Sequence, residues 1–360
     1  MTGPADDKTP LALGVDAMGA DAGPTALVEG AARALAAGVA ASITFFGDEA
    51  LLRPLVAQHA ALSGAKIDHC SASVAMTDKP MHVLRRGRDT SMWKAIEAQK
   101  EGRVRAVVSG GNTGALMAVS RMQLGMIAGV DRPAITALWP TPRGRVVVLD
   151  VGANVEANEH ELVTFAIMGE AFFRALTGKA KPTVGLLNVG AEELKGHDLI
   201  RNAAKTLREA DPDMAFIGFV EGNDISEGAA DVVVTDGFTG NIALKSAEGA
   251  ARLVGGWIKE ALTGSLLAKL GALLMMGDLK RLKEKIDPSS VNGGVFLGVN
   301  GVVVKSHGGA DAKGVASAID MAATLVGRGF RREVAETVAA VRARAAAGVP
   351  AAGDSIRAAE

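Results

Sequence analysis

A strand, a glycine-rich turn and the start of a helix follow one another in the first third of the chain. The apolar run 104–108 predicts a strand, and the stretch 109–116, Ser-Gly-Gly-Asn-Thr-Gly-Ala-Leu, leads into apolar residues at helical spacing. Glycine lacks a Cβ, so the backbone at Gly110 and Gly111 can approach a ligand closely, and the first amides of a helix have no partner within it. The layout predicts an anion cradle with Asn112 as N-cap; a tight turn without a ligand is the alternative.

Three further stretches repeat this arrangement, each directly after an apolar run that predicts a strand. Residues 150–156 and 188–193 each combine an asparagine in the turn or cap region with a glycine, and residues 235–241 open a helix expected to carry Lys245 near its first turn. Strands that alternate with helices predict an α/β fold with a mostly parallel sheet, whose ligands bind beyond the carboxyl ends of the strands. Four similar strand ends favour ligand binding over four unrelated turns. The predicted strands are 11–15, 43–46, 66–70, 104–108, 134–138, 145–149, 183–187, 216–219, 232–234 and 302–305, with a turn at 140–144, and the principal helices are 25–37, 49–62, 115–126, 161–176, 312–327 and 331–345.

Composition argues against nucleic acid as a partner. The 360 residues carry a net charge of -1, and aromatic residues amount to 4% without a single Tyr. There is neither a basic field to attract a polyanion nor an aromatic platform on which single-stranded bases could stack. The hydrophobic content of 48% provides a substantial core. We expect residues 11–345 to form a single α/β catalytic domain, with flexible tails at 1–10 and 346–360.

Thiol and metal chemistry are not expected. Cys70 is the single cysteine, which excludes an internal disulfide and a multi-cysteine metal site. A lone cysteine at the end of a strand is more often an inert apolar side chain than a nucleophile. Glu156 and His160 have the i, i+4 spacing of a helical metal pair that Asp150 would complete, but such a pair is ordinarily a surface feature.

Residues 253–286 differ from the rest because leucines and methionines are dense beside lysines. The pattern predicts amphipathic helices, either core or dimer-interface helices or a surface that contacts a membrane. No stretch approaches the run of about 18 apolar residues that spans a bilayer, and residues 1–10 lack the features of a secretory signal, so a cytoplasmic location is expected. Arg85, Arg86 and Arg88 form a basic cluster, which is either a solvated face or a site for an acidic protein or a phosphate group.

Charged residues stand where the first and last strands end. Asp16 follows the first strand, and Asp21 is expected to cap the next turn or helix. Lys305 ends the last strand, and His307 follows it before two glycines. His307 is a candidate for acid-base chemistry, with a structural role as the alternative.

Six short blocks carry these features: Asp-Ala-Met-Gly-Ala-Asp (16–21), Ser-Gly-Gly-Asn-Thr-Gly-Ala-Leu-Met (109–117), Leu-Asp-Val-Gly-Ala-Asn (149–154), Gly-Leu-Leu-Asn-Val-Gly (185–190), Thr-Asp-Gly-Phe-Thr-Gly-Asn (235–241) and Lys-Ser-His-Gly (305–308). In this order the chain resembles the PlsX family of phosphate acyltransferases of bacterial phospholipid synthesis, from about residue 11 to residue 327. Two positions depart from the family pattern: Ala20 replaces a usual glycine, and Thr90 precedes Ser91 where serine is usual. Neither departure removes a charged or nucleophilic group, so they affect loop details and not the expected activity.

The resemblance implies transfer of a fatty acyl group from acyl carrier protein to inorganic phosphate, giving acyl phosphate and free carrier, without a cofactor. It implies a homodimer with a three-layer α/β/α fold of the phosphotransacetylase and isopropylmalate-dehydrogenase type. It also implies peripheral attachment to the cytoplasmic membrane through a protruding amphipathic segment, and a downstream glycerol-3-phosphate acyltransferase. The residue chemistry is compatible, because phosphate has only to be held and aimed and needs no protein nucleophile.

Individual roles are hypotheses that combine the resemblance with the chemistry of each residue. Lys305 or His307 is expected to stabilise the oxyanion or to protonate the leaving thiolate, with Asp16 and Asp236 as orienting carboxylates. The expected phosphate- and thioester-binding residues are Gly111, Asn112, Thr113, Gly114, Asn154, Asn188, Asn241 and Lys245, and the expected partner-binding residues are Arg85, Arg86, Arg88, Lys280 and Arg281.

Two other functions remain open from the sequence. The first is a phosphotransacetylase that acts on a short acyl-coenzyme A, which a comparison of both donors would distinguish. The second is a membrane-docked scaffold that binds acyl carrier protein without turnover, suggested by the basic residues near 85–88 and 280–285.

Overall fold

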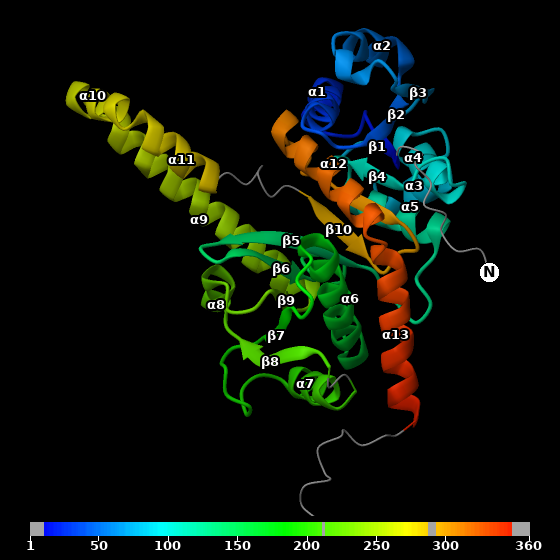
Figure 1. Cartoon of the computed structure of the whole chain (residues 1–360), viewed down its shortest axis with the longest axis vertical. Helices are drawn as coiled ribbons and strands as arrows, with labels where there is room; N and C mark the ends of the chain where they lie inside the picture. Colours follow the sequence, from blue (N-terminus) through cyan, green and yellow to red (C-terminus); the bar gives the residue numbers. More distant parts are fainter. Residues whose placement is uncertain (1–10, 211–212, 287–292, 348–360) are drawn as a thin grey trace, which may run out of the picture. The chain divides into compact units, whose positions relative to one another are not determined.

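The computed structural model describes residues 11–210, 213–286 and 293–347 (Figure 1). The chain divides into two compact units, one of residues 1–133, 175–177 and 292–336 (unit 1) and one of residues 134–174, 178–291 and 337–360 (unit 2). The expected tail 1–10 lies outside the described residues, as does the expected tail 346–360 apart from its first two residues.

Unit 1 is built on a sheet with the strand order β3-β2-β1-β4-β11-β10. All neighbouring strands are parallel except β10 and β11. The central strands β4 and β11 are buried along their length and apolar up to their last residues, as expected where helices cover both faces of a parallel sheet. The strands are β1 (Leu11–Asp16), β2 (Ala41–Gly47), β3 (Lys66–His69), β4 (Ala106–Ser109), β10 (Gly294–Leu297) and β11 (Val302–Lys305).

Two groups of helices cover the faces of this sheet. The helices α1 and α12 pack together on one face, and α4 packs on the other face beside α5 (Figure 1). Gly30 makes the first pairing possible, because a Cβ at this position would overlap Val315. The helices are α1 (Gly23–Ala36), α2 (Glu49–Ala57), the 3-10 turn η1 (Ala60–Leu62), α3 (Pro80–Arg86), α4 (Ser91–Lys100), α5 (Thr113–Leu124), α12 (Ala312–Gly327) and α13 (Phe330–Ala347), the last of which continues into unit 2.

Unit 2 has the strand order β5-β6-β9-β7-β8. The strands β5 and β6 form an antiparallel hairpin, and β6, β9, β7 and β8 run parallel. The elements are β5 (Ala134–Thr141), β6 (Gly144–Leu149), α6 (Glu159–Thr177), β7 (Thr183–Leu187), α7 (Asp198–Ala210), β8 (Ala215–Val220), α8 (Gly222–Glu227), β9 (Val232–Val234), α9 (Gly237–Thr263), α10 (Leu266–Leu274) and α11 (Met276–Ile286).

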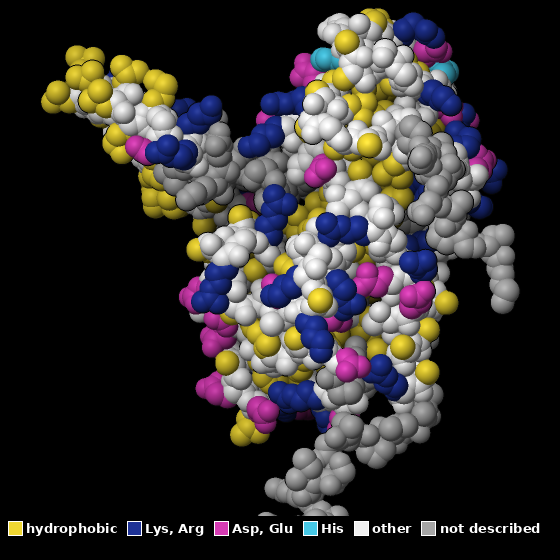
Figure 2. Space-filling model, in the orientation of Figure 1, with side chains coloured by type: hydrophobic (Ala, Val, Ile, Leu, Met, Phe, Trp, Pro, Cys, Tyr) yellow, Lys and Arg dark blue, Asp and Glu magenta, His cyan; other side chains and the backbone are white. Residues whose placement is uncertain are grey.

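The helices α9, α10 and α11 form the amphipathic segment predicted at 253–286. Figure 1 shows that they extend away from the sheet of unit 2, and hydrophobic side chains gather on α10 in Figure 2. Leu266 is 85% exposed and Leu274 is 83% exposed, and α10 has no buried residue. The interpretation of residues 253–286 as core helices is therefore wrong for the described residues, because the apolar side chains of α10 are exposed. No helix among the described residues is long and apolar enough to cross a membrane.

The α/β fold with a mostly parallel sheet is confirmed, and most predicted elements appear within a few residues of their expected bounds. Three local predictions are wrong. The helix expected at 49–62 ends at Ala57, because His59 is extended and a separate 3-10 turn follows. The turn expected at 140–144 is confined to two residues, because β5 continues through Pro140 to Thr141. Asp21 does not cap the following helix, because the N-cap of α1 is Ala22 and has no side-chain cap hydrogen bond.

Candidate active site

Three polar residues meet where β1, β4 and β11 of unit 1 end. These strands are parallel neighbours, and in register Ser109 lies opposite both Asp16 and Lys305. All three side chains are buried. Because the carboxyl ends of parallel strands share one edge of the sheet, residues nearly 300 positions apart in sequence come together here.

Asp16 organises this cluster as a hydrogen-bond acceptor. Its two carboxylate oxygens accept from Ser91 Oγ at 2.6 Å and from Ser109 Oγ at 2.7 Å. Burial raises the pKa of Asp16, while these hydroxyl bonds and the nearby Lys305 oppose the rise. Ser109 Oγ in turn accepts from the amide of Gly111 at 3.1 Å. The Asp16 carboxylate therefore positions the glycine turn through Ser109.

Lys305 places a cation beside the same turn. Its Nζ donates to the carbonyl of Gly110 at 3.1 Å and to the carbonyl of Ser306. Burial lowers the pKa of Lys305 to about 8, although Asp16 and Asp21 favour the charged form. Near neutral pH the Lys305 amine is therefore mostly protonated. The nearby carboxylates neutralise its charge only in part, so the ammonium can still attract an anion.

Asn112 caps α5 as predicted, but its side chain is occupied by the protein itself. Its Oδ1 accepts from the amide of Ala115 at 3.0 Å. Its Nδ2 donates to the carbonyls of Met76 at 2.8 Å and Asp78 at 2.9 Å. The amides of Thr113 and Gly114 make no hydrogen bond among the described residues. Backbone amides, and not the Asn112 side chain, are thus the free donors of the cradle.

Close contacts favour glycine in the cradle, most strictly at Gly110. A Cβ on Gly110 would lie 2.7 Å from the Cβ of Ala20, and a Cβ on Gly111 would lie 2.7 Å from Cε of Met92. The methyl group of Ala20 therefore leaves no room for a side chain at Gly110. These contacts place the turn against the loop that carries Ala20 and against helix α4.

His307 lies at the rim of the cluster. It is exposed, and its Nδ1 accepts from the amide of Gly309 at 3.2 Å. The adjoining Gly308 packs on Asp21, whose carboxylate would lie 2.6 Å from a Cβ at that position. His307 is therefore held on a fixed turn two residues beyond Lys305, with its ring accessible to solvent.

A second polar cluster lies at the carboxyl ends of β6, β9 and β7 in unit 2. The carboxylate of Asp150 is buried and accepts from the backbone amides of Ile135 at 3.0 Å, Ala153 at 3.0 Å and Asn154 at 2.7 Å, as well as Gly152. Asn154 Nδ2 adds a fifth bond at 2.9 Å. Burial raises the pKa of Asp150, and these bonds act against the rise. From the sequence, Asp150 was considered only as a third metal ligand. Its position between a strand and a glycine turn could have indicated that it organises the loop.

The start of α9 is packed directly on this loop. Asp236 caps α9 by accepting from the amide and hydroxyl of Thr239, each at 2.8 Å. A Cβ on Gly237 would lie 2.7 Å from the Asp150 carboxylate, and Asn241 Nδ2 donates to the carbonyl of Val151 at 3.0 Å. Asp236 and Asn241 thus have structural partners within unit 2.

Three details predicted around these loops are wrong. Lys245 is the ninth residue of α9 and not near its first turn, because the helix begins at Gly237, and it pairs with Glu248 at 3.2 Å. Asn154 does not cap α6; Asn158 does, in a capping box with Glu161. Glu156 therefore precedes the helix, so Glu156 and His160 are not a helical i, i+4 pair. Among the described residues no three His, Cys, Asp or Glu side chains form a possible metal site.

Asn188 holds the loop after β7 through its amide nitrogen. Nδ2 donates to the carbonyls of Gly190 at 3.2 Å and Lys195 at 3.1 Å. Its buried Oδ1 has no hydrogen-bond partner among the described residues and packs against Gly196. The Asn188 side chain therefore shapes a loop and does not point at open space.

The residues predicted to bind a partner are exposed in two places. Arg85 and Arg86 end α3, and Arg88 follows it. Lys280 and Arg281 lie on α11, where Arg281 pairs with Asp278.

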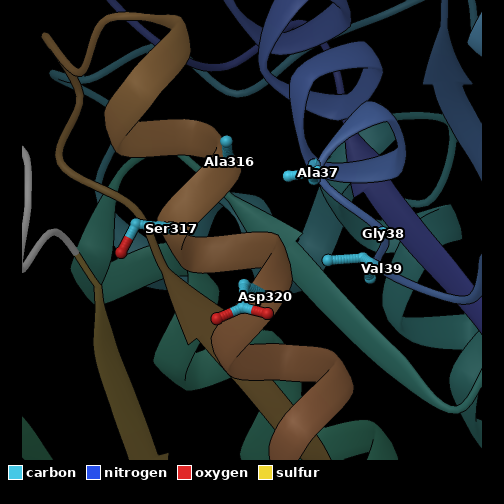
Figure 3. A pocket seen from close by; sticks show the side chains of 7 residues that line it. Ala37, Gly38, Val39, Ala316, Ser317 and Asp320 are labelled. Atoms are coloured by element: carbon cyan, nitrogen blue, oxygen red, sulfur yellow. The ribbon is translucent and has the colours of Figure 1, made fainter.

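Two features of unit 1 lie outside the polar cluster. Cys70 is buried and its pKa is raised to about 11, mainly by burial, which suppresses the reactive thiolate. A pocket of about 410 Å³ lies between α1 and α12 (Figure 3). Its lining consists of small residues with Ser317 and Asp320, and none of the strand-end residues contributes to it.

The fold is shared with a class of α/β enzymes that includes phosphotransacetylases. A phosphotransacetylase from Streptococcus pyogenes superposes with a TM-score of 0.58 at 16% identity, covering 89% of this chain and 94% of that one. The EutD phosphotransacetylase from Staphylococcus aureus gives a TM-score of 0.56 at 14% identity, covering 88% and 94%. At these identities the likeness concerns the fold alone.

The sequence places the chain more narrowly. The family model described as "Fatty acid synthesis protein" matches residues 11–333. The chain is 56% identical over 326 residues to the phosphate acyltransferase of Maricaulis maris, covering 89% of this chain and 93% of that protein. It is 52% identical over 338 residues to that of Caulobacter vibrioides, covering 94% of both. The chain belongs to the phosphate acyltransferase family and is an acyltransferase.

Proposed function

We propose that the protein transfers a fatty acyl group from acyl carrier protein to inorganic phosphate. A phosphate oxygen attacks the thioester carbonyl carbon, the carbon–sulfur bond breaks, and the leaving thiolate takes a proton. The products are acyl phosphate and free carrier thiol, so the reaction needs no oxidant or cofactor. A product of this kind is an activated acyl donor, which suits consumption by a glycerol-3-phosphate acyltransferase.

The observation that carries this proposal is the cradle at the start of α5. The amides of Thr113 and Gly114 are free donors among the described residues, and the ammonium of Lys305 lies at the neighbouring Gly110 carbonyl. Helix N-termini and cations both favour a dianion such as phosphate. A fixed cradle of this kind holds phosphate for attack and needs no protein nucleophile.

Separate roles follow for the surrounding side chains. Lys305 offsets charge on phosphate and on the developing oxyanion, and Asp16 keeps the turn in place through Ser109. His307 is the exposed group that supplies a proton to the leaving thiolate. Asn112 acts on phosphate only through the helix end that it caps.

The strand-end residues of unit 2 are proposed to bind substrate through the loops that they shape. Asn154 and Asn241 fix the loop after β6, and Asn188 fixes the loop after β7. Asp236 acts as the cap of α9. Lys245, more than two turns into that helix, is a weaker candidate for direct contact with phosphate.

Acyl phosphate formation from acyl carrier protein, with and without phosphate, tests the reaction. The variant His307→Ala should lose about 10²- to 10⁴-fold in kcat, while His82→Ala, an exposed histidine on α3, serves as the matched control. Normal turnover by His307→Ala would remove His307 from the mechanism. A preference for acyl-coenzyme A at equal donor concentration would instead indicate a phosphotransacetylase, and carrier binding without turnover would indicate a scaffold.

We propose that the basic cluster Arg85, Arg86 and Arg88 binds the acidic acyl carrier protein. The three side chains are exposed on or beside α3, which packs against α5. Replacing all three with glutamate should raise KM for the acyl carrier and leave KM for phosphate unchanged, because like charges repel across an interface. An unchanged KM for the carrier would assign docking elsewhere, with Lys280 and Arg281 as the next candidates.

We propose that the apolar face of α10 attaches the protein peripherally to the cytoplasmic membrane, and that α9 contributes to a homodimer. Leu273 and Leu274 are exposed on α10, and Trp257 is 58% exposed on α9. Leu273→Glu with Leu274→Glu should abolish flotation with anionic lipid vesicles and preserve activity in solution. Met122→Glu, an equally apolar exposed site in unit 1, is the control, and flotation that survives the paired change would exclude α10 as the anchor.

A further inference from the structure

Met76 lies beside the phosphate cradle in a position that the protein fixes with several hydrogen bonds. The Asn112 side chain holds the Met76 and Asp78 carbonyls at 2.8 and 2.9 Å. The turn is closed by the Ala75 amide, which donates to the Asp78 carboxylate at 2.8 Å, and by the Asp78 amide, which donates to the Ala75 carbonyl at 3.1 Å. The residue that caps the cradle therefore also sets the place of Met76.

The Met76 side chain reaches the turn that carries His307. A Cβ on Gly308 would lie 3.2 Å from Cε of Met76, so the methyl group lies close to the residue that follows His307. The side chain is nevertheless 42% exposed, and it does not belong to the core of unit 1. Part of the Met76 side chain is thus accessible to solvent beside the turn that carries the proposed proton donor.

Pro80 extends this apolar surface to the start of α5. A Cβ on Gly114 would lie 3.1 Å from Cγ of Pro80. The polar groups Asp16, Ser109 and Lys305 are associated with the strand ends and the glycine turn, whereas Met76 and Pro80 flank the helix start and the His307 turn. The cradle therefore combines charged groups and apolar side chains.

A fatty acyl thioester has the same division. Its carbonyl must reach the phosphate, and the chain attached to that carbonyl offers only methylene groups. The 75–78 turn suits such an acyl chain because the Asp78 carboxylate and the carbonyls of Met76 and Asp78 already have hydrogen-bond partners. The amides of a carrier's prosthetic arm would gain little there. Methionine is flexible and polarisable, which lets one side chain follow an apolar chain closely.

We propose that Met76 contacts the first methylene groups of the acyl chain and favours long-chain donors over short ones. The inference rests on the proposed function, because it identifies the apolar part of the same donor. Met76 is a specificity-determining residue in this proposal, and it has no part in proton transfer or in binding phosphate.

The test compares kcat/KM for hexadecanoyl and acetyl groups carried by acyl carrier protein. It uses the complete enzyme and saturating phosphate. Met76→Ala should lower the hexadecanoyl-to-acetyl ratio about tenfold, the effect of a lost apolar contact in a specificity pocket. Met76→Leu, which keeps the volume, should restore the ratio to within about twofold of the wild type. Met81→Ala, at a methionine that is 59% exposed on α3, is the matched control and should leave the ratio unchanged.

The hexadecanoyl-to-acetyl ratio of kcat/KM distinguishes a contact between Met76 and the acyl chain from a purely structural role of Met76. If Met76 only supported the turn, Met76→Ala would reduce turnover of both donors equally and raise KM for phosphate, which would overturn the inference. An unchanged ratio in an active Met76→Ala variant would overturn it as well. Failure of the wild type to form acyl phosphate from either donor would reject the proposed function itself.

Discussion

The pH dependence of catalysis should report the ionisation of Lys305. With a pKa of about 8, the ammonium is about nine-tenths charged at pH 7, about half charged at pH 8 and about one-tenth charged at pH 9. If the cation holds phosphate, kcat/KM for phosphate should fall about fivefold between pH 8 and pH 9. Because kcat/KM describes the free enzyme, and a bound dianion stabilises the ammonium, kcat should fall at a higher pH than kcat/KM.

Initial rates of carrier thiol release from pH 6.5 to pH 9.5, corrected with a phosphate-free blank, measure this profile. Lys305→Met should be slow throughout and should lack the part of the alkaline limb that comes from the Lys305 ammonium, because methionine does not titrate. Lys305→Arg keeps the charge at every pH, so any activity it retains should also lack that limb. A flat wild-type profile between pH 7 and pH 9.5, or the same limb in Lys305→Met, would refute the role assigned to Lys305.

The stability of the protein should change in the opposite direction, which separates titration from unfolding. The pKa of Lys305 is lowered from 10.5 to about 8 in the folded protein. The unfolded state therefore binds more protons between these values, and the contribution of Lys305 to the free energy of unfolding rises with pH, by about 1.4 kcal/mol per pH unit at most. The Cys70 thiol acts in the opposite direction, because its pKa is raised from 9.0 to about 11 in the folded protein, and it offsets part of this rise as the pH approaches 9. Activity assays and urea unfolding over this pH interval should together show that activity falls while the contribution of Lys305 to the free energy of unfolding rises.

Three further predictions concern the loops and the thiol. Gly110→Ala should lower activity because its Cβ would lie 2.7 Å from that of Ala20, and Ala20→Gly in the same chain should recover much of the loss; no recovery would locate the strain elsewhere. Asn158→Ala should lower the free energy of unfolding by about 1 kcal/mol through loss of the α6 cap with turnover preserved, and a loss of turnover in folded protein would contradict its purely structural role. Cys70 should react with a thiol reagent far more slowly at pH 8 in the native protein than in urea, since it is buried and its pKa is about 11; equal rates would contradict that burial.

Much of the fold could be predicted because apolar runs and helical spacing are local properties of the sequence. The strand Val232–Val234 and the helix Ala312–Gly327 appear with the bounds expected for them. The errors arise where a tertiary contact decides the local structure. Helix α9 begins at Gly237, where the Asp236 cap is a local signal in the sequence, whereas the close packing of Gly237 on Asp150 is a long-range contact that the sequence does not show.

The candidate site was predictable in its residue types but not in its connections. The strand ends and glycines around Asp16, Asn112 and Lys305 are visible in sequence, and the register of parallel strands brings them together. The bonds from Ser91 to Asp16 and from Asn112 to Met76 join loops separated by 75 and 36 residues. Such bonds depend on how the loops are packed, so Ser91, Ser109 and Met76 could not be assigned roles from local pattern.

The two polar clusters differ in what they leave available to a ligand. Asp150 uses four backbone amides and Asn154 to close the loop after β6, so the loop already has an anion at its centre, and a second one there would be repelled. Asp16 instead accepts mainly from two hydroxyls, and the amides of Thr113 and Gly114 remain free among the described residues. Phosphate therefore has hydrogen bonds and a cation to gain at the cradle of unit 1, whereas the Asp150 loop is complete without it. This contrast is why the proposed mechanism assigns phosphate to the first cluster and gives the second a supporting role for the loops around it.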